Sequence, residues 1–274
     1  MRFASILHQG RPHAVLIDGA DAIPLAGIAE LGLATPSSVL RDPPLDRAAS
    51  VPLDAVQLRP VIPQPRRVIC VGLNYRAHVA ESGREEPEYP VLFTKFASSL
   101  AGPYDAIPCP PESSAVDYEG ELLVVIGQAG RRVPEDRALE LVAGYAVADD
   151  ITMRDYQNRT HQWLQGKAWD ASTPVGPHLV SADEVGDPAA LSVRTTLNGQ
   201  VVQDAPTARM IFSVPTLVSV ISQFTGLEPG DLILTGTPEG VGFRREPPLL
   251  LHDGDVVAVE VDGVGRLENR MTAG

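Results

Sequence analysis

Short apolar runs separated by turn residues dominate the chain from Arg67 onward. Each run is rich in β-branched side chains or alternates apolar with polar residues, which is the pattern of a β-strand. The predicted strands are Val68–Val71, Val91–Lys95, Glu119–Ile126, Gly144–Ile151, Arg194–Leu197, Leu232–Leu234, Val256–Val261 and Gly265–Arg270. Strands and helices do not alternate, which disfavours a Rossmann-type or barrel α/β fold. With 24 Gly and 25 Pro in 274 residues to supply turns, the sequence predicts a mostly β (α+β) fold.

One hairpin turn and two helices stand out within this pattern. Asn198-Gly199 joins two apolar runs and is typical of a type I′ turn, whose two central positions require positive φ. One helix is expected to begin after Asn74, acting as N-cap, and to end near Ser82-Gly83. The other is expected at about Pro215–Thr225, with one apolar face formed by Leu217, Val218, Ile221 and Phe224.

The first 65 residues differ in texture from the rest. Arg2–Leu7 and His13–Ile17 predict a hairpin, and Ala/Leu-rich and Pro-rich connections follow it. The segment Arg59–Pro65 holds three prolines and is predicted to be a stiff linker or the entry to a second domain. We therefore expect a small N-terminal domain at residues 1–65 and a larger domain at residues 66–274.

The charge balance excludes several classes of partner. The chain has 22 Lys and Arg against 35 Asp and Glu, a formal net charge of −13, and no basic cluster. Such a protein repels nucleic acid and anionic membrane surfaces. No apolar run is long enough to cross a bilayer, and Cys70 and Cys109 form no metal-binding or disulfide spacing. A cytoplasmic protein is expected, with Cys70 a small buried hydrophobic residue.

Acidic residues lie at the ends of two predicted apolar strands. Glu119 and Glu121 are two apart, so on a strand they share one face, whereas Asp149 and Asp150 are adjacent and at most one can join them. Carboxylates alone favour a hard cation such as Mg²⁺, Mn²⁺ or Ca²⁺. The alternative for either pair is a solvated acidic loop or strand end.

Three further groups could take part in chemistry. His78 and Glu81 are three apart and would be neighbours on a helix, where the carboxylate raises the basicity of the imidazole. Lys167 lies between Trp163 and Trp169, and the loop Thr235–Gly242 offers hydroxyls and backbone amides to a substrate oxygen. Taken singly, the His78–Glu81 pair is typical of an ordinary helix surface. Likewise, Lys167 is typical of a surface charge and the loop of an ordinary turn.

Taken in order, these motifs resemble those of the fumarylacetoacetate hydrolase family. The resemblance covers residues 66–270 and rests on Asn74–Glu81, Phe93–Lys95, Asp117–Ile126, Gly144–Gln157, Gly166-Lys167, Asn198-Gly199 and Thr235–Pro238. It implies a rolled, mixed β-sheet domain, a homodimer or higher oligomer, and a Mg²⁺ or Mn²⁺ ion, which Ca²⁺ could replace in crystals. Two departures from the family pattern are Gly120, expected to loosen its strand, and Asp149, which places an extra acid beside the site.

The resemblance also assigns residues by motif. It implies that the metal ligands are Glu119, Glu121 and Asp150, and that Asp149 is not one. His78 and Glu81 match a dyad on a short helix that activates water, and Lys167 matches a lysine that faces the reacting carbonyl. The residues that match positions around the substrate and the metal are Lys95, Arg154, Gln157 and Thr237.

The activity expected first is hydrolysis of a C–C bond in a small 2,4-dioxo acid of the acylpyruvate or fumarylpyruvate type. His78 would deprotonate water, Lys167 would stabilise the oxyanion, and the metal would act as Lewis acid and template. The alternative is decarboxylation of a 2-oxo acid such as oxaloacetate, or isomerisation or tautomerisation of a hydroxydienedioate, because these reactions share an enolate. A dimeric binding scaffold without activity is the third hypothesis.

Overall fold

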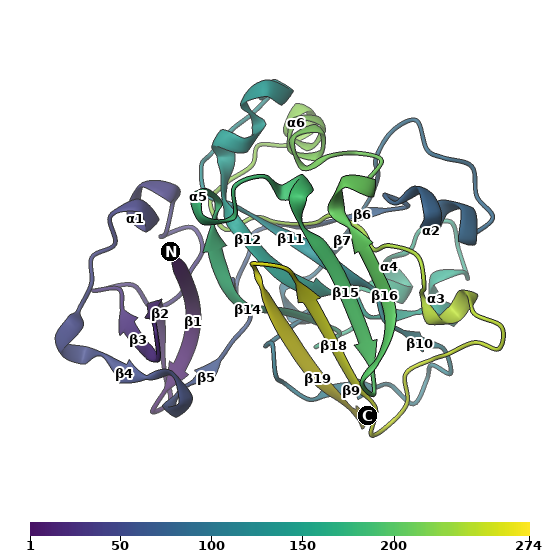
Figure 1. Cartoon of the computed structure of the whole chain (residues 1–274), viewed down its shortest axis with the longest axis horizontal. Coiled ribbons are helices and arrows are strands. Elements are labelled where there is room, and N and C mark those ends of the chain that lie inside the picture. Colours follow the sequence, from purple (N-terminus) through teal and green to yellow (C-terminus); the bar gives the residue numbers. More distant parts are fainter.

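The computed structural model describes residues 1–274, and one large sheet runs through most of the molecule (Figure 1). It has twelve strands, ten of them in the order β4 (Val51–Pro52), β3 (Asp21–Pro24), β2 (Arg11–Asp18), β1 (Arg2–His8), β14 (Thr173–Ser181), β12 (Val142–Asp149), β11 (Gly120–Ile126), β17 (Leu232–Leu234), β6 (Val68–Gly72) and β7 (Val91–Lys95). The other two, β5 (Gln57–Leu58) and β8 (Leu100–Ala101), pair with β1 and β14. Most neighbours are antiparallel, but β17 pairs with β6 and β14 with β8 in parallel.

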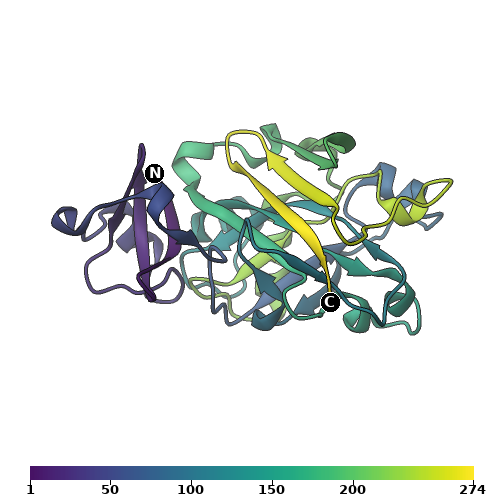
Figure 2. The ribbon, with the colours of Figure 1, turned by 90° about the horizontal axis from the view of Figure 1, so that it is seen from below.

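A second sheet covers part of the first (Figure 2). Its five strands are β16 (Gln200–Pro206), β15 (Ser192–Leu197), β18 (Val256–Val261), β19 (Gly265–Ala273) and β9 (Ile107–Cys109). A two-stranded ribbon of β10 (Val116–Asp117) and β13 (Thr152–Met153) completes the β structure. The mostly β fold with mixed sheets and a small N-terminal β region is confirmed. Asn198 and Gly199 have φ of 51° and 81° between β15 and β16, as the predicted hairpin requires.

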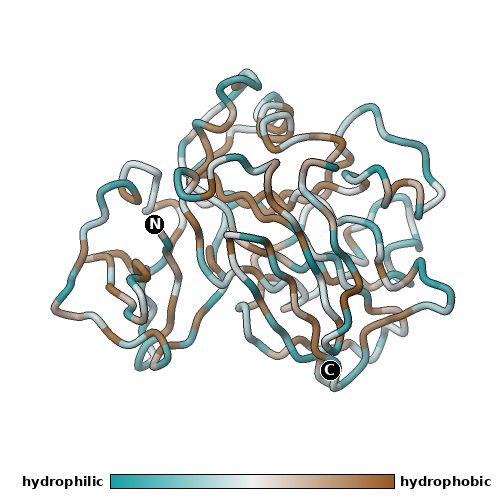
Figure 3. Tube along the Cα trace, viewed as in Figure 1, coloured by the Kyte–Doolittle hydropathy of each residue, from teal (hydrophilic) through white to brown (hydrophobic).

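The central strand β11 explains where the core lies. All seven of its residues are buried, because side chains alternate between two faces that are both covered. Leu122 and Val124 face a cluster that includes Val193 and Val259 of the second sheet. Leu123 and Val125 belong to a different cluster on the other face. The hydrophobic stretches of Figure 3 follow these strands, while the connecting loops are more hydrophilic.

The helices are short and lie around the sheets. They are α1 (Ser37–Arg41), α2 (Arg76–Glu81), α3 (Arg154–Gln157), α4 (Leu164–Lys167), α5 (Ala182–Val185) and α6 (Val214–Phe224). Helix α6 begins after Ser213, whose hydroxyl accepts a hydrogen bond from Thr216 N. It buries Leu217, Val218 and Ile221, but the prediction for Phe224 was wrong: Phe224 ends the helix and is 61% exposed. None of these helices has both the length and the apolar character required to cross a membrane.

The N-terminal hairpin continues the large sheet directly. Phe3 of β1 lies opposite Leu179 of β14, and Val61 and Ile62 are buried in the core cluster that also holds Phe3. The segment Arg59–Pro65, predicted to be a stiff linker or the entry to a second domain, therefore packs two of its residues into the core. Strand β14, which makes this junction, was missed, because Pro174, Gly176 and Pro177 give it the composition of a turn.

Gly120 tightens its strand, contrary to the loosening expected from the sequence. A Cβ atom at this position would lie 2.2 Å from Thr195 Oγ1 and 2.9 Å from Val259 Cγ1, so the second sheet approaches β11 only because the side chain is missing. Gly120→Ala should lower the free energy of unfolding by about 1–3 kcal/mol through overpacking. Denaturant unfolding measures it, with Gly226→Ala as control, because a Cβ there meets nothing closer than 3.9 Å. Equal stability of the two variants would contradict this packing.

Candidate active site

Three carboxylates meet where β11 begins and β12 ends. In this antiparallel pair Gly120 lies opposite Asp149, and the backbone N–H of Asp150 donates to Glu119 O at 2.9 Å. Glu119, Glu121 and Asp150 each offer one oxygen within 4.8 Å of the others, and all three are buried. The pairing of two strand ends thus brings together residues about 30 positions apart in sequence.

Asp149 lies beside this cluster without joining it. Its Oδ1 accepts a hydrogen bond from the backbone N–H of Glu119 at 2.8 Å, so the carboxyl group braces the start of β11. Burial raises the pKa of Asp149 to about 7, although the Glu119 N–H acts in the opposite direction. Only one of the two adjacent aspartates therefore contributes to the cluster.

Three buried cations surround the carboxylates. Lys95 Nζ lies 2.5 Å from Asp150 Oδ1, and Lys167 Nζ lies 2.8 Å from both Glu119 Oε2 and Asp150 Oδ2. Arg154 Nη1 is 2.6 Å from Glu119 Oε1 and donates to Gln157 Oε1 at 3.1 Å. Arg154 Nη2 is buried without a partner, and the Lys167 ammonium has a third N–H that neither carboxylate uses. Both cations can therefore donate to a bound oxygen.

The buried charges do not balance. Five carboxyl groups are buried here with three cations, the carboxyls being Asp117, Glu119, Glu121, Asp149 and Asp150. Burial, Asp150 and Glu119 raise the pKa of Glu121. Burial also acts on Glu119, but Lys167 and Arg154 outweigh it and lower its pKa to about 2. A divalent cation would supply the two missing positive charges, and a donor set made only of oxygens fits Mg²⁺, Mn²⁺ or Ca²⁺.

The loop after β17 holds the glutamate strand in place. The backbone N–H of Gly236 donates to Glu121 Oε2 at 2.7 Å, and Thr237 Oγ1 donates to Gly120 O at 3.0 Å. Gln203 Oε1 accepts a hydrogen bond from the Gly120 N–H at 3.0 Å, and Gln203 Nε2 donates one to Thr237 Oγ1 at 2.8 Å. Gln203 was not singled out from the sequence, and it connects the second sheet to the site.

The imidazole–carboxylate pair lies on α2, as its spacing predicts. His78 Nδ1 is 3.3 Å from Glu81 Oε2, and Glu81 is itself held by the Gly240 N–H at 3.0 Å. This contact leaves His78 Nε2 for the pocket that His78 lines. Asn74 is not the N-cap: Tyr75 precedes the helix, and the Asn74 side chain instead donates to Thr235 O and to Phe212 O.

Asp117 is a site residue that sequence reasoning did not assign. Its carboxylate accepts from Arg154 Nε at 2.8 Å and from the backbone N–H groups of Gly242 and Phe243. It therefore orients Arg154 and fixes the loop that borders the site. The signal in the sequence was its place in the acidic run Asp117–Glu121, from which only the two glutamates were assigned a role.

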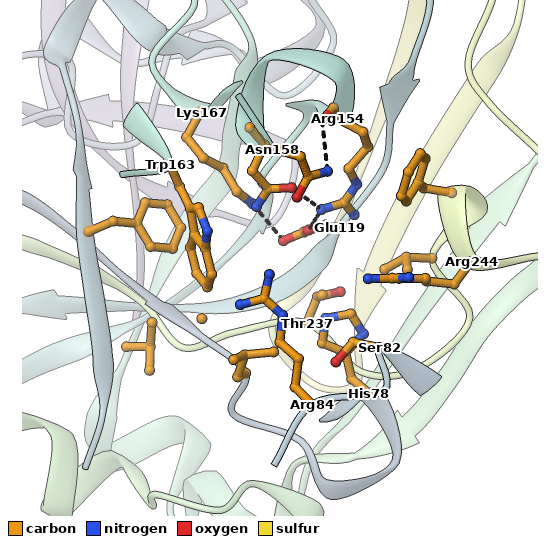
Figure 4. Close-up of a pocket in the computed structure, with 17 residues that line it drawn as sticks. His78, Ser82, Arg84, Glu119, Arg154, Asn158, Trp163, Lys167, Thr237 and Arg244 are labelled. Carbon is orange, nitrogen blue, oxygen red and sulfur yellow. Dashed lines mark hydrogen bonds and ion pairs between the residues drawn. The ribbon is translucent and has the colours of Figure 1, made fainter. Parts of the chain in front are cut away.

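Several of these groups line a pocket of about 570 Å³, part of it open solvent (Figure 4). His78 and Thr237 lie on one side of it, and Glu119, Arg154 and Lys167 on the other. Gln157 also lines it, whereas Lys95, which contacts Asp150, does not. Gly166 has Gln157 so close that a Cβ would lie 2.5 Å from Gln157 Cβ, and this contact between α3 and α4 positions Lys167.

Comparison with known proteins agrees with this geometry. Residues 67–272 match the family described as fumarylacetoacetate (FAA) hydrolase C-terminal. Oxaloacetate tautomerase Fahd2a, mitochondrial, of Rattus norvegicus is 43% identical over 222 residues, which cover 81% of this chain and 71% of that protein.

Several solved structures are similar to this chain over its whole length, among them two that are named for a reaction. One is 2-hydroxyhepta-2,4-diene-1,7-dioate isomerase from Mycobacterium marinum, with 34% identity, a TM-score of 0.83 and 98% of that chain covered. The other is maleylpyruvate hydrolase from Sphingobium.sp SYK-6, with 27% identity, a TM-score of 0.80 and 100% of that chain covered. The chain is therefore an enzyme of the fumarylacetoacetate hydrolase family.

Proposed function

We propose that the protein is a metal-dependent tautomerase of a small 2-oxo acid, with oxaloacetate as the first compound to test. The observation that carries the proposal is the His78–Glu81 pair, whose imidazole lines one pocket with Arg154, Lys167 and Glu119. Glu119 is in turn one of the three clustered buried carboxylates. Interconversion of keto and enol forms needs a group that moves a proton at carbon and cations that stabilise the enolate oxygen. The curated relative at 43% identity is named for this reaction on oxaloacetate.

The side chains would divide the work as follows. Glu81 fixes the imidazole orientation, and His78 Nε2 gives a proton to C3 of the enol while the enol hydroxyl loses its proton to solvent. Arg154 Nη2 and the third N–H of Lys167 donate to the substrate oxygens. Glu119, Glu121 and Asp150 would hold Mg²⁺ or Mn²⁺, which when bound supplies Lewis-acid polarisation of the 2-oxo group.

Hydrolysis of an acylpyruvate, expected first from the sequence, becomes the second candidate. Its support is the same His78–Glu81 pair, which can deprotonate water, and the similarity to maleylpyruvate hydrolase at 27% identity. The tautomerase is favoured because the relative named for it is more similar to this chain.

A homodimer is also proposed from the family resemblance, and sedimentation would test it.

A comparison of products separates the candidates. Purified protein with Mg²⁺ or Mn²⁺ is given the enol form of oxaloacetate, an acylpyruvate and fumarylpyruvate. If the enol absorbance is lost faster than in the protein-free blank, and no more CO₂ or pyruvate forms than in that blank, the result supports the tautomerase. Pyruvate and the matching acid formed from a dioxo acid, with the ketonisation rate at the blank, would replace it by the hydrolase. CO₂ release above the metal-only blank would indicate decarboxylation.

A further inference from the structure

The pocket is lined by two positively charged side chains that have no role in the site described so far. Four of its lining side chains are cations and one is a carboxylate, in a protein with a net charge of −13. Lys167 and Arg154 are bound to buried carboxylates at the inner end. Arg84 and Arg244 are exposed at the mouth, and neither forms an ion pair with any residue of the chain. Two guanidinium groups therefore border the same pocket without an anion.

Arg84 is held in place without a carboxylate. Its guanidinium carbon lies 5.4 Å from the centre of the Trp163 ring, within the range of a cation–π contact. Trp163 meets Phe93 edge to face, with ring centres 5.6 Å apart, and a Cβ on Gly72 would lie 2.2 Å from Trp163 Cζ3. The ring is thus confined on two sides and fixes the arginine that stacks on it. Figure 4 shows Arg84 pointing into the pocket beside Trp163.

Arg244 approaches from a different segment. It ends the turn Gly242–Arg244, whose backbone is fixed by Asp117 through the N–H groups of Gly242 and Phe243. Its guanidinium carbon lies 5.6 Å from the Phe243 ring centre, and the side chain borders the pocket on the side of His78 in Figure 4. Two separate segments of the chain therefore present unpaired guanidinium groups around one pocket.

We infer that Arg84 and Arg244 form a subsite for the second carboxylate of a dicarboxylic 2-oxo acid, the carboxylate farther from the 2-oxo group. This inference rests on the proposed function, which places the 2-oxo acid end of the substrate at Arg154, Lys167 and the buried carboxylates. Guanidinium groups bind carboxylates through charge-assisted, often bidentate hydrogen bonds. A substrate with a methyl group in place of that carboxylate would leave both arginines unpaired.

A pair of ligands that cannot tautomerise tests the subsite. L-Malate and (S)-2-hydroxybutanoate share the 2-hydroxy acid end and differ in having a carboxylate or a methyl group at C4. Their affinities are measured by calorimetry in excess Mg²⁺ for the wild type, Arg84→Gln, Arg244→Gln and the control Arg11→Gln. Arg11 is exposed and unpaired, lies in the N-terminal hairpin and does not line the pocket, so its variant removes the same charge elsewhere.

The wild type should bind malate at least about tenfold more tightly than 2-hydroxybutanoate, because a hydrogen-bonded charge pair contributes about that factor. Arg84→Gln and Arg244→Gln should each weaken malate by about tenfold and leave 2-hydroxybutanoate within about twofold. Arg11→Gln should change neither. Equal affinities in the wild type, or an equal loss of both ligands in the arginine variants, would overturn the subsite.

The result is separable from the proposed function because neither ligand is turned over. A preference for malate that depends on the arginines, in a protein that does not ketonise oxaloacetate, would keep the subsite and reject the tautomerase. Ketonisation by a protein that shows no preference would do the reverse.

Discussion

His78→Ala should lower kcat for ketonisation of enol-oxaloacetate by about 10²–10⁴-fold, the range that a positioned acid–base group contributes. The His78 imidazole contacts the Glu81 carboxylate through Nδ1, and its Nε2 remains for substrate in the pocket that His78 lines. The loss should fall on kcat, because the groups proposed to bind the 2-oxo acid are Arg154 and Lys167. Following the enol absorbance under saturating substrate measures it.

His252→Ala is the matched control. His252 also lies three residues from a carboxylate, Asp255, but at 3.8 Å and with a side chain that is 75% exposed. It should keep wild-type kcat and the wild-type melting temperature. Wild-type kcat in His78→Ala, at unchanged thermal stability, would remove His78 from the proton transfer.

Glu121→Gln should abolish tight metal binding with little cost to the metal-free fold. Burial together with Asp150 and Glu119 raises the pKa of Glu121, so the metal-free protein already favours an uncharged group at this position. A glutamine oxygen can still accept the Gly236 N–H. Substitutions of residues that only contact the metal ligands typically weaken metal affinity by about 10–100-fold. Loss of the charge of a ligand itself should weaken Mn²⁺ binding by more than this. Titration with Mn²⁺ and thermal unfolding with chelator measure the two effects.

Glu119→Gln provides the contrast that makes this result specific. Glu119 is ion-paired with Lys167 and Arg154, which lower its pKa to about 2, so its loss leaves two buried cations without their partner. We expect it to destabilise the metal-free protein by about 3–5 kcal/mol as well as to weaken metal binding. Glu112→Gln, at an exposed acid outside the site, should do neither. Unchanged Mn²⁺ affinity in Glu121→Gln would contradict the carboxylate site.

The parts of the site that the sequence predicts are those carried by short spacings. Glu119 and Glu121 share a face because the strand period is two, and His78 reaches Glu81 because the helix spacing is three to four. The adjacency of Asp149 and Asp150 limits the cluster to one of them for the same reason. Such contacts follow from local geometry, so a pattern in the sequence is enough to propose them.

The parts that were missed depend on contacts between distant segments. Asp117 orients Arg154 across 37 positions, and Asn74 bridges two loops that lie about 140 and 160 positions away, so neither role has a local signal. From the sequence, Gly120 is expected to loosen its strand, because nothing local predicts that Thr195 and Val259 pack against it. Strand β14 is hidden by its prolines although it joins the N-terminal hairpin to the rest of the sheet.

The most direct test of a metal-dependent tautomerase is the ketonisation rate of enol-oxaloacetate in protein depleted of metal and then titrated with Mn²⁺. We predict that the chelated protein is no faster than the blank, that activity returns with one Mn²⁺ per chain, and that Glu121→Gln shows no return under the same titration. Acceleration that survives complete chelation, or none at any metal concentration, would contradict the account.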